Sequence, residues 1–141
     1  MIEIRATTYE DFVIAKELAL DIYMHTYSFE GEIPYETYVT MFKGNAVLGL
    51  IGTTPLHEGV YHIYAILTKN IYMCPISFVR FCKKLIRDKM SLFSAHRAQM
   101  DIAADYQAGH RWATALGFTP EGVMKKYGYN KTDHVLYARV L

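Results

Sequence analysis

The sequence has little cysteine, almost no net charge and no long hydrophobic run. Cys74 and Cys82 are its two cysteines, and one pair cannot build a disulfide framework, so we expect a reducing compartment. Fifteen basic and fourteen acidic side chains leave a net charge of +1, whereas nucleic-acid and membrane-surface binders usually show a clear basic excess. No stretch approaches the ~20 apolar residues that a membrane span requires. We therefore expect neither nucleic acid nor a membrane as a partner.

Motifs of several enzyme classes are also missing. The sequence contains no GxSxG string and no Walker-type glycine loop, which leaves a nucleophilic hydrolase or a nucleoside triphosphatase unsupported. Its six histidines show no paired spacing typical of metal ligands, and the two cysteines have no second pair. We therefore expect no metal site.

The residues that are present indicate a folded domain. Hydrophobic residues make up 52% of the chain and charged residues 21%, which is too apolar for a disordered chain. The length of 141 residues fits one domain, and we expect a single domain over residues 1–141. The N-terminal residues include acidic side chains and no apolar run, which predicts neither a signal peptide nor a transit peptide. We therefore expect a cytoplasmic protein.

The spacing of apolar residues predicts a mixed α/β chain. Strands are expected at residues 2–5, 46–51, 60–67, 98–103, 121–127 and 133–140. Helices are expected at residues 9–27, 35–40, 75–90 and 107–116. The nearly continuous apolar run Val60–Leu67 predicts a central strand covered on both faces, with residues 98–103 as its parallel neighbour. The fold class is therefore α/β (α+β), with a mixed sheet of six or seven strands and helices on both faces.

Capping and turn residues mark the ends of several of these elements. Thr8 is a typical N-cap for the first helix, and Gly117 is a typical left-handed C-cap for the last one. The stretch from Gly52 to Gly59 is expected to be a loop because glycines bound it. Trp112 is expected to pack inward on the last helix.

The last thirty residues carry a more specific pattern. The segment from residue 110 to 140 is HRWATALGFTPEGVMKKYGYNKTDHVLYARV, and its marking strings are Leu116-Gly117-Phe118, Glu121-Gly122 and Asp133 with Tyr137. This pattern, together with the order of the elements, resembles the GNAT superfamily of acyl-CoA-dependent N-acyltransferases. The resemblance implies a GNAT-like domain over the whole chain and acetyl-CoA as the cofactor. It also implies an amine acceptor, either a small molecule or a protein N-terminus or lysine.

The cofactor loop departs from the GNAT pattern. Family members hold the cofactor pyrophosphate with an Arg/Gln-x-x-Gly-x-Gly/Ala loop at a helix N-terminus, whereas this chain has Tyr72-Met73-Cys74-Pro75-Ile76-Ser77 there. Pro75 has no amide proton, and side chains at both glycine positions obstruct a close approach. Acetyl-CoA binding is therefore expected to be weak or lost. The residues that the resemblance leaves for contact with acetyl-CoA are Leu67, Thr68, Cys74, Ile76, Ser77 and Phe78.

Acyl transfer to an amine needs a base for the amine proton, donors for the oxyanion and an acid for the thiolate. In this fold the base lies on the central strand or its neighbour, where the candidates are His62, Tyr64 and Asp101. His62 has the best unperturbed pKa, but a histidine on a buried strand is often a hydrogen-bonded core residue. Tyr127 or Tyr129 is the candidate acid. At the last helix, many GNAT proteins have an Asn and, seven residues later, a Tyr that protonates the thiolate. This sequence has Tyr106 and Ala113 at the matching positions.

A second resemblance points away from catalysis. The length, the glycine-poor loop and the basic helix at residues 80–89 are similar to the GNAT-like small internal virion proteins of T7-like phages. This resemblance implies a non-catalytic binding or structural protein in a virion or host cytoplasm, with virion partners or a second copy as its partner. The basic run itself has three open interpretations: a solvated helix face, a site for the CoA 3′-phosphate, or a contact with an acidic partner.

Overall fold

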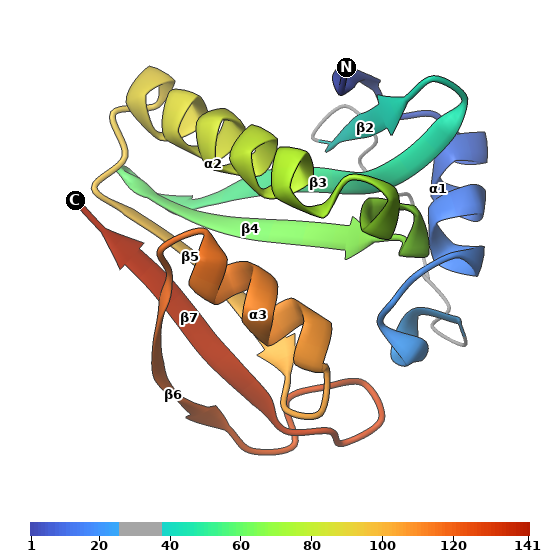
Figure 1. Ribbon diagram of the computed structural model, residues 1–141. Coiled ribbons are helices and arrows are strands. Elements are labelled where there is room, and N and C mark those ends of the chain that lie inside the picture. Colours follow the sequence, from blue (N-terminus) through green and yellow to red (C-terminus); the bar gives the residue numbers. More distant parts are fainter. Residues whose placement is uncertain (26–37) are drawn as a thin grey trace. The chain divides into compact units, whose positions relative to one another are not determined.

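The computed structural model describes residues 1–25 and 38–141. In chain order, its α-helices and strands are β1 (Glu3–Ala6), α1 (Tyr9–Glu17), β2 (Tyr38–Lys43), β3 (Ala46–His57), β4 (Val60–Leu67), α2 (Pro75–Leu92), β5 (Arg97–Ala103), α3 (Gln107–Ala115), β6 (Thr119–Met124) and β7 (His134–Val140). The described residues also include two short 3₁₀ helices, η1 (Ile22–His25) and η3 (Lys69–Met73). Figure 1 shows the arrangement of the labelled helices and strands.

The described strands form one mixed sheet in the order β1-β2-β3-β4-β5-β7-β6. β4 pairs with β5 in parallel, and the pairs β1–β2, β2–β3, β5–β7 and β6–β7 are antiparallel. The predicted mixed sheet, and the parallel neighbours Val60–Leu67 and residues 98–103 within it, are therefore confirmed. Contacts divide the chain into unit 1 (Met1–Thr53 and Tyr64–Phe78) and unit 2 (Thr54–Ile63 and Val79–Leu141).

In unit 1, helix α1 begins as predicted and ends ten residues early. Thr8 accepts a hydrogen bond from the Asp11 amide, and the Asp11 carboxylate accepts one from the Thr8 amide, which forms a capping box. The helix ends at Glu17, so the expected helix at residues 9–27 is wrong for residues 18–25, while residues 26 and 27 lie outside the described residues. The reason is a non-local pairing: the Leu18 carbonyl accepts a hydrogen bond from the Lys69 amide, and Ala19 forms a β-bridge with Thr68.

Strands β2 and β3 correct two further predictions. Residues 38–40 were expected in a helix but begin β2, because their backbone pairs with β1 on one side and β3 on the other. Residues 35–37 of that expected helix lie outside the described residues. The expected loop from Gly52 to Gly59 is wrong as far as His57, because these residues continue strand β3. The turn is confined to Glu58 and Gly59. The φ of Gly59 is +79°, a value that glycine adopts more readily than other residues.

The hydrophobic core of unit 1 joins α1 to the sheet. Its buried cluster draws on α1 and the chain that follows it, on β3 and on β4, and comprises Phe12, Ala15, Ala19, Val47, Leu50 and Ile66. The cluster explains why α1 lies where it does: its apolar side must be removed from water against the strands.

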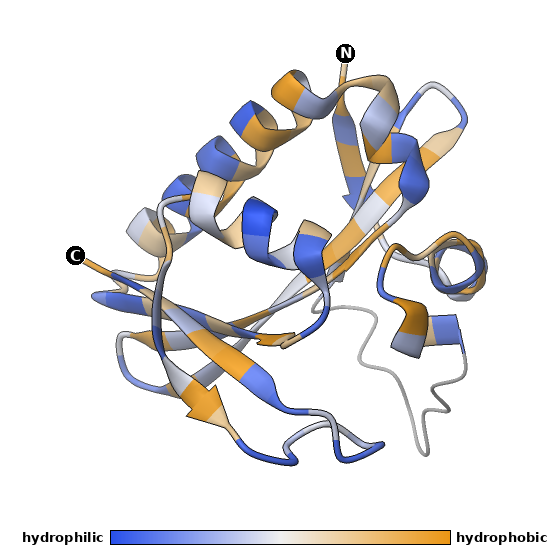
Figure 2. Cartoon of the chain, turned by 60° about the horizontal axis from the view of Figure 1, so that its bottom comes forward, coloured by the Kyte–Doolittle hydropathy of each residue, from blue (hydrophilic) through white to orange (hydrophobic). Residues whose placement is uncertain are grey.

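Helices α2 and α3 each have a buried apolar face. Hydrophobic and hydrophilic bands alternate along α2 (Figure 2), and Cys82, Ile86 and Met90 form its buried stripe. On α3, Trp112 is buried as predicted, and Gly117 follows the helix end with a φ of +87°. The basic run of α2 lies on its solvent side and includes an ion pair of 2.6 Å between Lys84 Nζ and Asp88 Oδ2.

The C-terminal hairpin pairs β6 with β7, and β7 with β5 (Figure 1). β6 ends at Met124, so the expected strand at residues 121–127 is wrong for its last three residues. Tyr127 therefore lies in the connecting segment between the two strands. Lys126 and Lys131 in this segment both have positive φ, which is typical of tight turns and ends strand geometry.

Candidate functional site

Strand β5 has one apolar face and one polar face. Ala98, Met100 and Ile102 are buried, as expected for one face of an alternating strand. The residues between them, Gln99 and Asp101, project to the other face together with Arg97 at the start of the strand. This polar face of β5 is where the candidate site forms.

Asp101 lies between two histidines. His62 on β4 places Nε2 at 2.9 Å from Asp101 Oδ2, and His134 at the start of β7 places Nδ1 at 2.7 Å from Asp101 Oδ1. The side chains of His62, Asp101 and His134 are 8%, 14% and 19% exposed. The structure thus brings together two of the predicted bases, His62 and Asp101, and adds a third side chain.

Hydrogen bonds control the charge of Asp101. Burial raises the pKa of its carboxyl, but hydrogen bonds from His62 and His134 outweigh burial and hold this pKa below its ordinary value. Asp101 is therefore a carboxylate at neutral pH and acts as an acceptor for both rings. A carboxylate in this place orients the imidazoles and stabilises the protonated form of either.

A polar chain continues from His62 along the same face. The Gln99 amide nitrogen lies 3.5 Å from His62 Nδ1, which makes a long contact. Arg97 Nε donates to Gln99 Oε1 at 2.9 Å, and the Arg97 guanidinium forms a bidentate pair with Glu121 on β6. The Glu-Gly string of the sequence thus contributes a carboxylate that anchors this chain of side chains.

Tyr127, the predicted acid, lies beside His134. The two rings meet edge to face with centroids 5.4 Å apart, and Tyr127 is 56% exposed. Tyr129, the other candidate acid, is also exposed. The third base candidate, Tyr64, belongs to unit 1 and is partly exposed.

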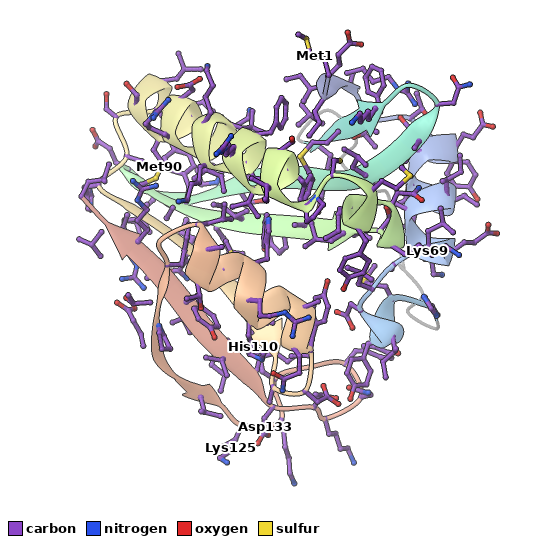
Figure 3. All side chains as sticks on the ribbon, viewed as in Figure 1. Met1, Lys69, Met90, His110, Lys125 and Asp133 are labelled. Carbon is purple, nitrogen blue, oxygen red and sulfur yellow. The ribbon has the colours of Figure 1, made fainter. Side chains whose placement is uncertain are left out.

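The hairpin around His134 is held by Asp133. Its carboxylate accepts hydrogen bonds from the Lys126 amide at 2.9 Å and from Lys125 Nζ at 3.4 Å. Figure 3 shows Lys125 and Asp133 together at this end of the hairpin. The Asp-x-x-x-Tyr string therefore has a structural role at its first residue, which fixes the connecting segment next to His134.

The last residue of that string holds α3. Tyr137 Oη donates to His110 Nδ1 at 2.8 Å, while His110 Nε2 donates to the Ala103 and Ala104 carbonyls at 3.0 Å each. These bonds join α3 to the end of β5, directly after Asp101 in the chain. Tyr137 and His110 thus support the site without facing Asp101.

In unit 1, both proton donors of Thr68, the backbone amide and the side-chain hydroxyl, form hydrogen bonds to backbone carbonyls. Its amide donates to the Leu48 carbonyl at 2.9 Å, and its hydroxyl donates to the Val47 carbonyl at 2.8 Å. Neither the amide nor the hydroxyl of Thr68 is therefore available as a donor to acetyl-CoA. Leu67 is buried, and its carbonyl accepts a hydrogen bond from the Leu20 amide.

The start of α2 is where the sequence predicted a pyrophosphate site, and some of the amides there already have partners. The Cys74 amide donates to the Ile71 carbonyl at 3.1 Å, and the Phe78 amide donates to the Cys74 carbonyl at 2.9 Å. The amides of Cys74 and Phe78 are thus not available as donors, which corrects that part of the prediction. Ile76 and Ser77 are exposed in the first turn, where helix amides have no partner within the helix.

His134 is the residue that sequence reasoning missed. It is adjacent to Asp133, which the family pattern marks, but nothing in the sequence places it near Asp101. The register of β5 with β7, which pairs Ala103 with His134 and Asp101 with Leu136, brings the two together. A signal was available in the predicted hairpin, because the start of its second strand must lie near the end of an adjacent antiparallel strand.

The described part of the chain has neither a cluster of metal ligands nor a helix that could span a membrane. Among residues 1–25 and 38–141, no group of three or more His, Cys, Asp or Glu side chains could hold a metal ion. In the same residues, no helix has both the length and the apolarity to cross a bilayer.

Comparison with known proteins gives matches at the level of structure. No protein-family model and no curated protein matches the sequence. A GNAT-family acetyltransferase from Bacillus anthracis has 17% identity and a TM-score of 0.74, with 99% of this chain and 94% of that chain covered. A ribosomal-protein alanine acetyltransferase from Vibrio fischeri has 17% identity, a TM-score of 0.73 and coverage of 99% and 92%.

A third structure was solved with a cofactor. The ribosomal alpha-N-protein acetyltransferase RimL, in complex with coenzyme A, has 18% identity and a TM-score of 0.72. The match covers 99% of this chain and 94% of RimL. With the strand order and the parallel β4–β5 pair, these matches establish that the chain has the fold of GNAT-family acetyltransferases.

Proposed function

We propose that this protein is an acetyl-CoA-dependent N-acetyltransferase that acts on a primary amine, either of a small molecule or of a protein N-terminus or lysine. The observation that carries the proposal is the acetyltransferase fold over 99% of the chain. Asp101 with its two histidines adds the proton-handling groups that acyl transfer to an amine needs.

The residues at the start of α2 fit a reduced pyrophosphate site. The amides of Ile76 and Ser77 and the Ser77 hydroxyl remain as donors, and the 18-residue helix adds its positive N-terminal dipole. Pro75 removes one donor, while the Cys74 and Phe78 amides are bound elsewhere. We therefore expect acetyl-CoA to bind weakly. When bound, it supplies the acetyl group as a thioester.

The test is an acetyl-transfer assay with the full chain. Acetyl-CoA is mixed with polyamines, with peptides that have a free N-terminus and with lysine peptides, and the released thiol is measured with a chromogenic disulfide. We expect thiol release with at least one amine, and a loss of at least about 100-fold in Asp101→Asn, since general base catalysis contributes about that much or more. Release that is the same without an amine would contradict the proposal.

One observation favours a second candidate, a non-catalytic GNAT-fold protein. Pro75 and Ser77 occupy both glycine positions of the cofactor loop, and such a protein would bind a partner, in a virion or as a homodimer, rather than acetyl-CoA. Isothermal titration calorimetry with acetyl-CoA separates the two functions. Heat of binding supports the acetyltransferase, and no heat at millimolar acetyl-CoA supports the non-catalytic protein.

A further inference from the structure

We propose that His134, and not His62, accepts the proton of the substrate amine, through its Nε2 atom. The inference rests on the proposed acetyl transfer. In that reaction the amine nitrogen bonds to the acetyl carbon, and the carbon–sulfur bond breaks with its electron pair leaving on sulfur. One amine proton moves to His134 Nε2, and the sulfur takes a proton from solvent. Asp101, Gln99 and Arg97 are positioning residues that act through the two imidazoles.

The hydrogen-bond donors fix the tautomer of His62. Arg97 has only N–H groups, so its Nε must donate to the oxygen of the Gln99 amide. The Gln99 NH₂ group then faces His62 Nδ1, which must be the unprotonated nitrogen of a neutral ring. The remaining proton of His62 is on Nε2 and is donated to Asp101 Oδ2.

This arrangement disqualifies His62 as the base. Its Nε2 bears a proton directed at Asp101, and its Nδ1 faces the Gln99 amide. The side chain is also only 8% exposed. A general base must reach the proton that it abstracts, and His62 presents no unprotonated nitrogen to a substrate.

The same carboxylate leaves His134 with a free lone pair. His134 Nδ1 donates to Asp101 Oδ1 at 2.7 Å, so in the neutral ring Nε2 carries no proton. No hydrogen bond from the described residues 1–25 or 38–141 reaches this Nε2. An imidazole that donates Nδ1–H to a carboxylate and presents a bare Nε2 is the arrangement that makes histidine a general base.

Gly128 keeps the approach to that nitrogen open. A Cβ atom at residue 128 would lie 2.9 Å from His134 Nε2 and 3.2 Å from the Thr132 carbonyl oxygen. Any side chain there would press on the imidazole from the side on which Nε2 lies. The glycine thus serves the site, because no positive φ requires glycine at this residue.

Charged and aromatic groups surround His134. Asp101 faces it from β5 as a carboxylate, and Tyr127 faces it from the connecting segment. His62 on β4 contacts the other oxygen of Asp101, and the carboxylate of Asp133 is bound to the Lys126 amide and Lys125. The nearest charge is therefore the negative one of Asp101, which stabilises the imidazolium.

The first test reads the tautomers directly and needs no activity. Long-range ¹H–¹⁵N correlation spectra of the ¹⁵N-labelled protein above pH 8 report which ring nitrogen of each histidine carries the proton. Histidine-to-glutamine variants assign the signals. We expect His134 protonated on Nδ1 and His62 protonated on Nε2. A proton on Nε2 of His134 would overturn the inference.

The second test uses matched variants in the acetyl-transfer assay. His134→Asn keeps an amide donor near the place of Nδ1 but removes the base, while His62→Gln keeps a donor near the place of Nε2. We expect His134→Asn to lower kcat at least about 100-fold, with little change in KM, and to remove the acid limb of the pH profile. His62→Gln is expected to cost less than about tenfold.

The two failures can be told apart. The reverse order of the two losses would overturn the assignment of His134 as the base. A parent protein that acetylates no amine would overturn the proposed function, and the base assignment with it. The tautomer spectra would still decide whether Asp101 and Gln99 orient the rings as inferred.

Discussion

The burial of Trp112 was predicted directly from the sequence and is confirmed. Its side chain is 6% exposed on α3, so truncation removes a large apolar group and leaves a cavity. We expect Trp112→Ala to lower the free energy of unfolding by about 3–5 kcal/mol, measured by urea denaturation. Arg111→Ala, at the exposed neighbouring residue, is the control and should change it by less than about 0.5 kcal/mol. A loss below about 1 kcal/mol for Trp112→Ala would contradict its place in the core.

Gly128 gives a second prediction at the scale of one atom. Gly128→Ala adds a methyl group beside His134 Nε2, so we expect acetyl transfer to fall at least about tenfold, since one methyl group can displace the base from reach of its proton. Gly122→Ala is the matched control, because a Cβ there meets no atom within 4 Å and the activity should be unchanged. Equal activity of Gly128→Ala and the parent protein would show that this side of Nε2 is not used.

Among the elements, we expect the loop before α2 to determine the affinity for acetyl-CoA. Pro75→Gly with Ser77→Gly restores one amide donor and relieves the crowding at the helix N-terminus. One or two hydrogen bonds to a charged group, at ~1.5–3 kcal/mol each, correspond to a roughly ten- to ten-thousand-fold gain in affinity. We expect calorimetry to show that the affinity for acetyl-CoA rises at least about tenfold, which is the lower end of this range. A double variant that folds normally and still gives no heat with acetyl-CoA would argue for the non-catalytic protein.

Local signals predicted the elements well where the chain itself determines them. The capping box at Thr8, the strand Val60–Leu67 and the glycine end of α3 all depend on residues close in sequence. The end of α1 depends on Lys69 and Thr68, some fifty residues away, and no local pattern carries that information. The candidate site follows the same division between local and non-local information. His62 and Asp101 were each recognisable as candidate bases from the sequence, but only separately.

His134 shows what the sequence could not supply. Its role depends on the β5–β7 register and on the orientation of the Gln99 amide, and both are properties of paired strands. The cofactor loop shows the opposite case, because the lack of an amide proton at Pro75 can be read directly from the sequence. The committed amides of Cys74 and Phe78, however, depend on the turn that η3 makes before α2.

For the whole molecule, one buried carboxylate in each unit links stability to pH. Burial raises the pKa of Asp11, but hydrogen bonds from Arg5, the Thr8 amide and Thr40 outweigh it, and the pKa of Asp101 is lowered in the same way. A carboxyl whose pKa is lower in the folded state stabilises the fold above its unfolded pKa of about 3.9 and loses this contribution as the pH falls through the folded pKa.

We therefore expect acid to lower the free energy of unfolding steeply below pH ~4, where the unfolded carboxyls take up protons and the folded ones do not. Urea denaturation at pH 7, 4 and 3 measures the slope. Asp11→Asn and Asp101→Asn should each flatten it, and the double variant should flatten it further. A slope that neither single variant changes would show that other groups control acid stability.

The division into units has a consequence for how the protein can be cut. Unit 1 comprises two separate stretches of sequence and so does unit 2, with crossings inside β3, inside β4 and inside α2. No single break in the chain separates the two units. Any continuous fragment that holds all of one unit therefore also carries part of the other, so the pieces of a split-protein reporter or of a library of gene fragments built on this chain cannot each contain one unit alone.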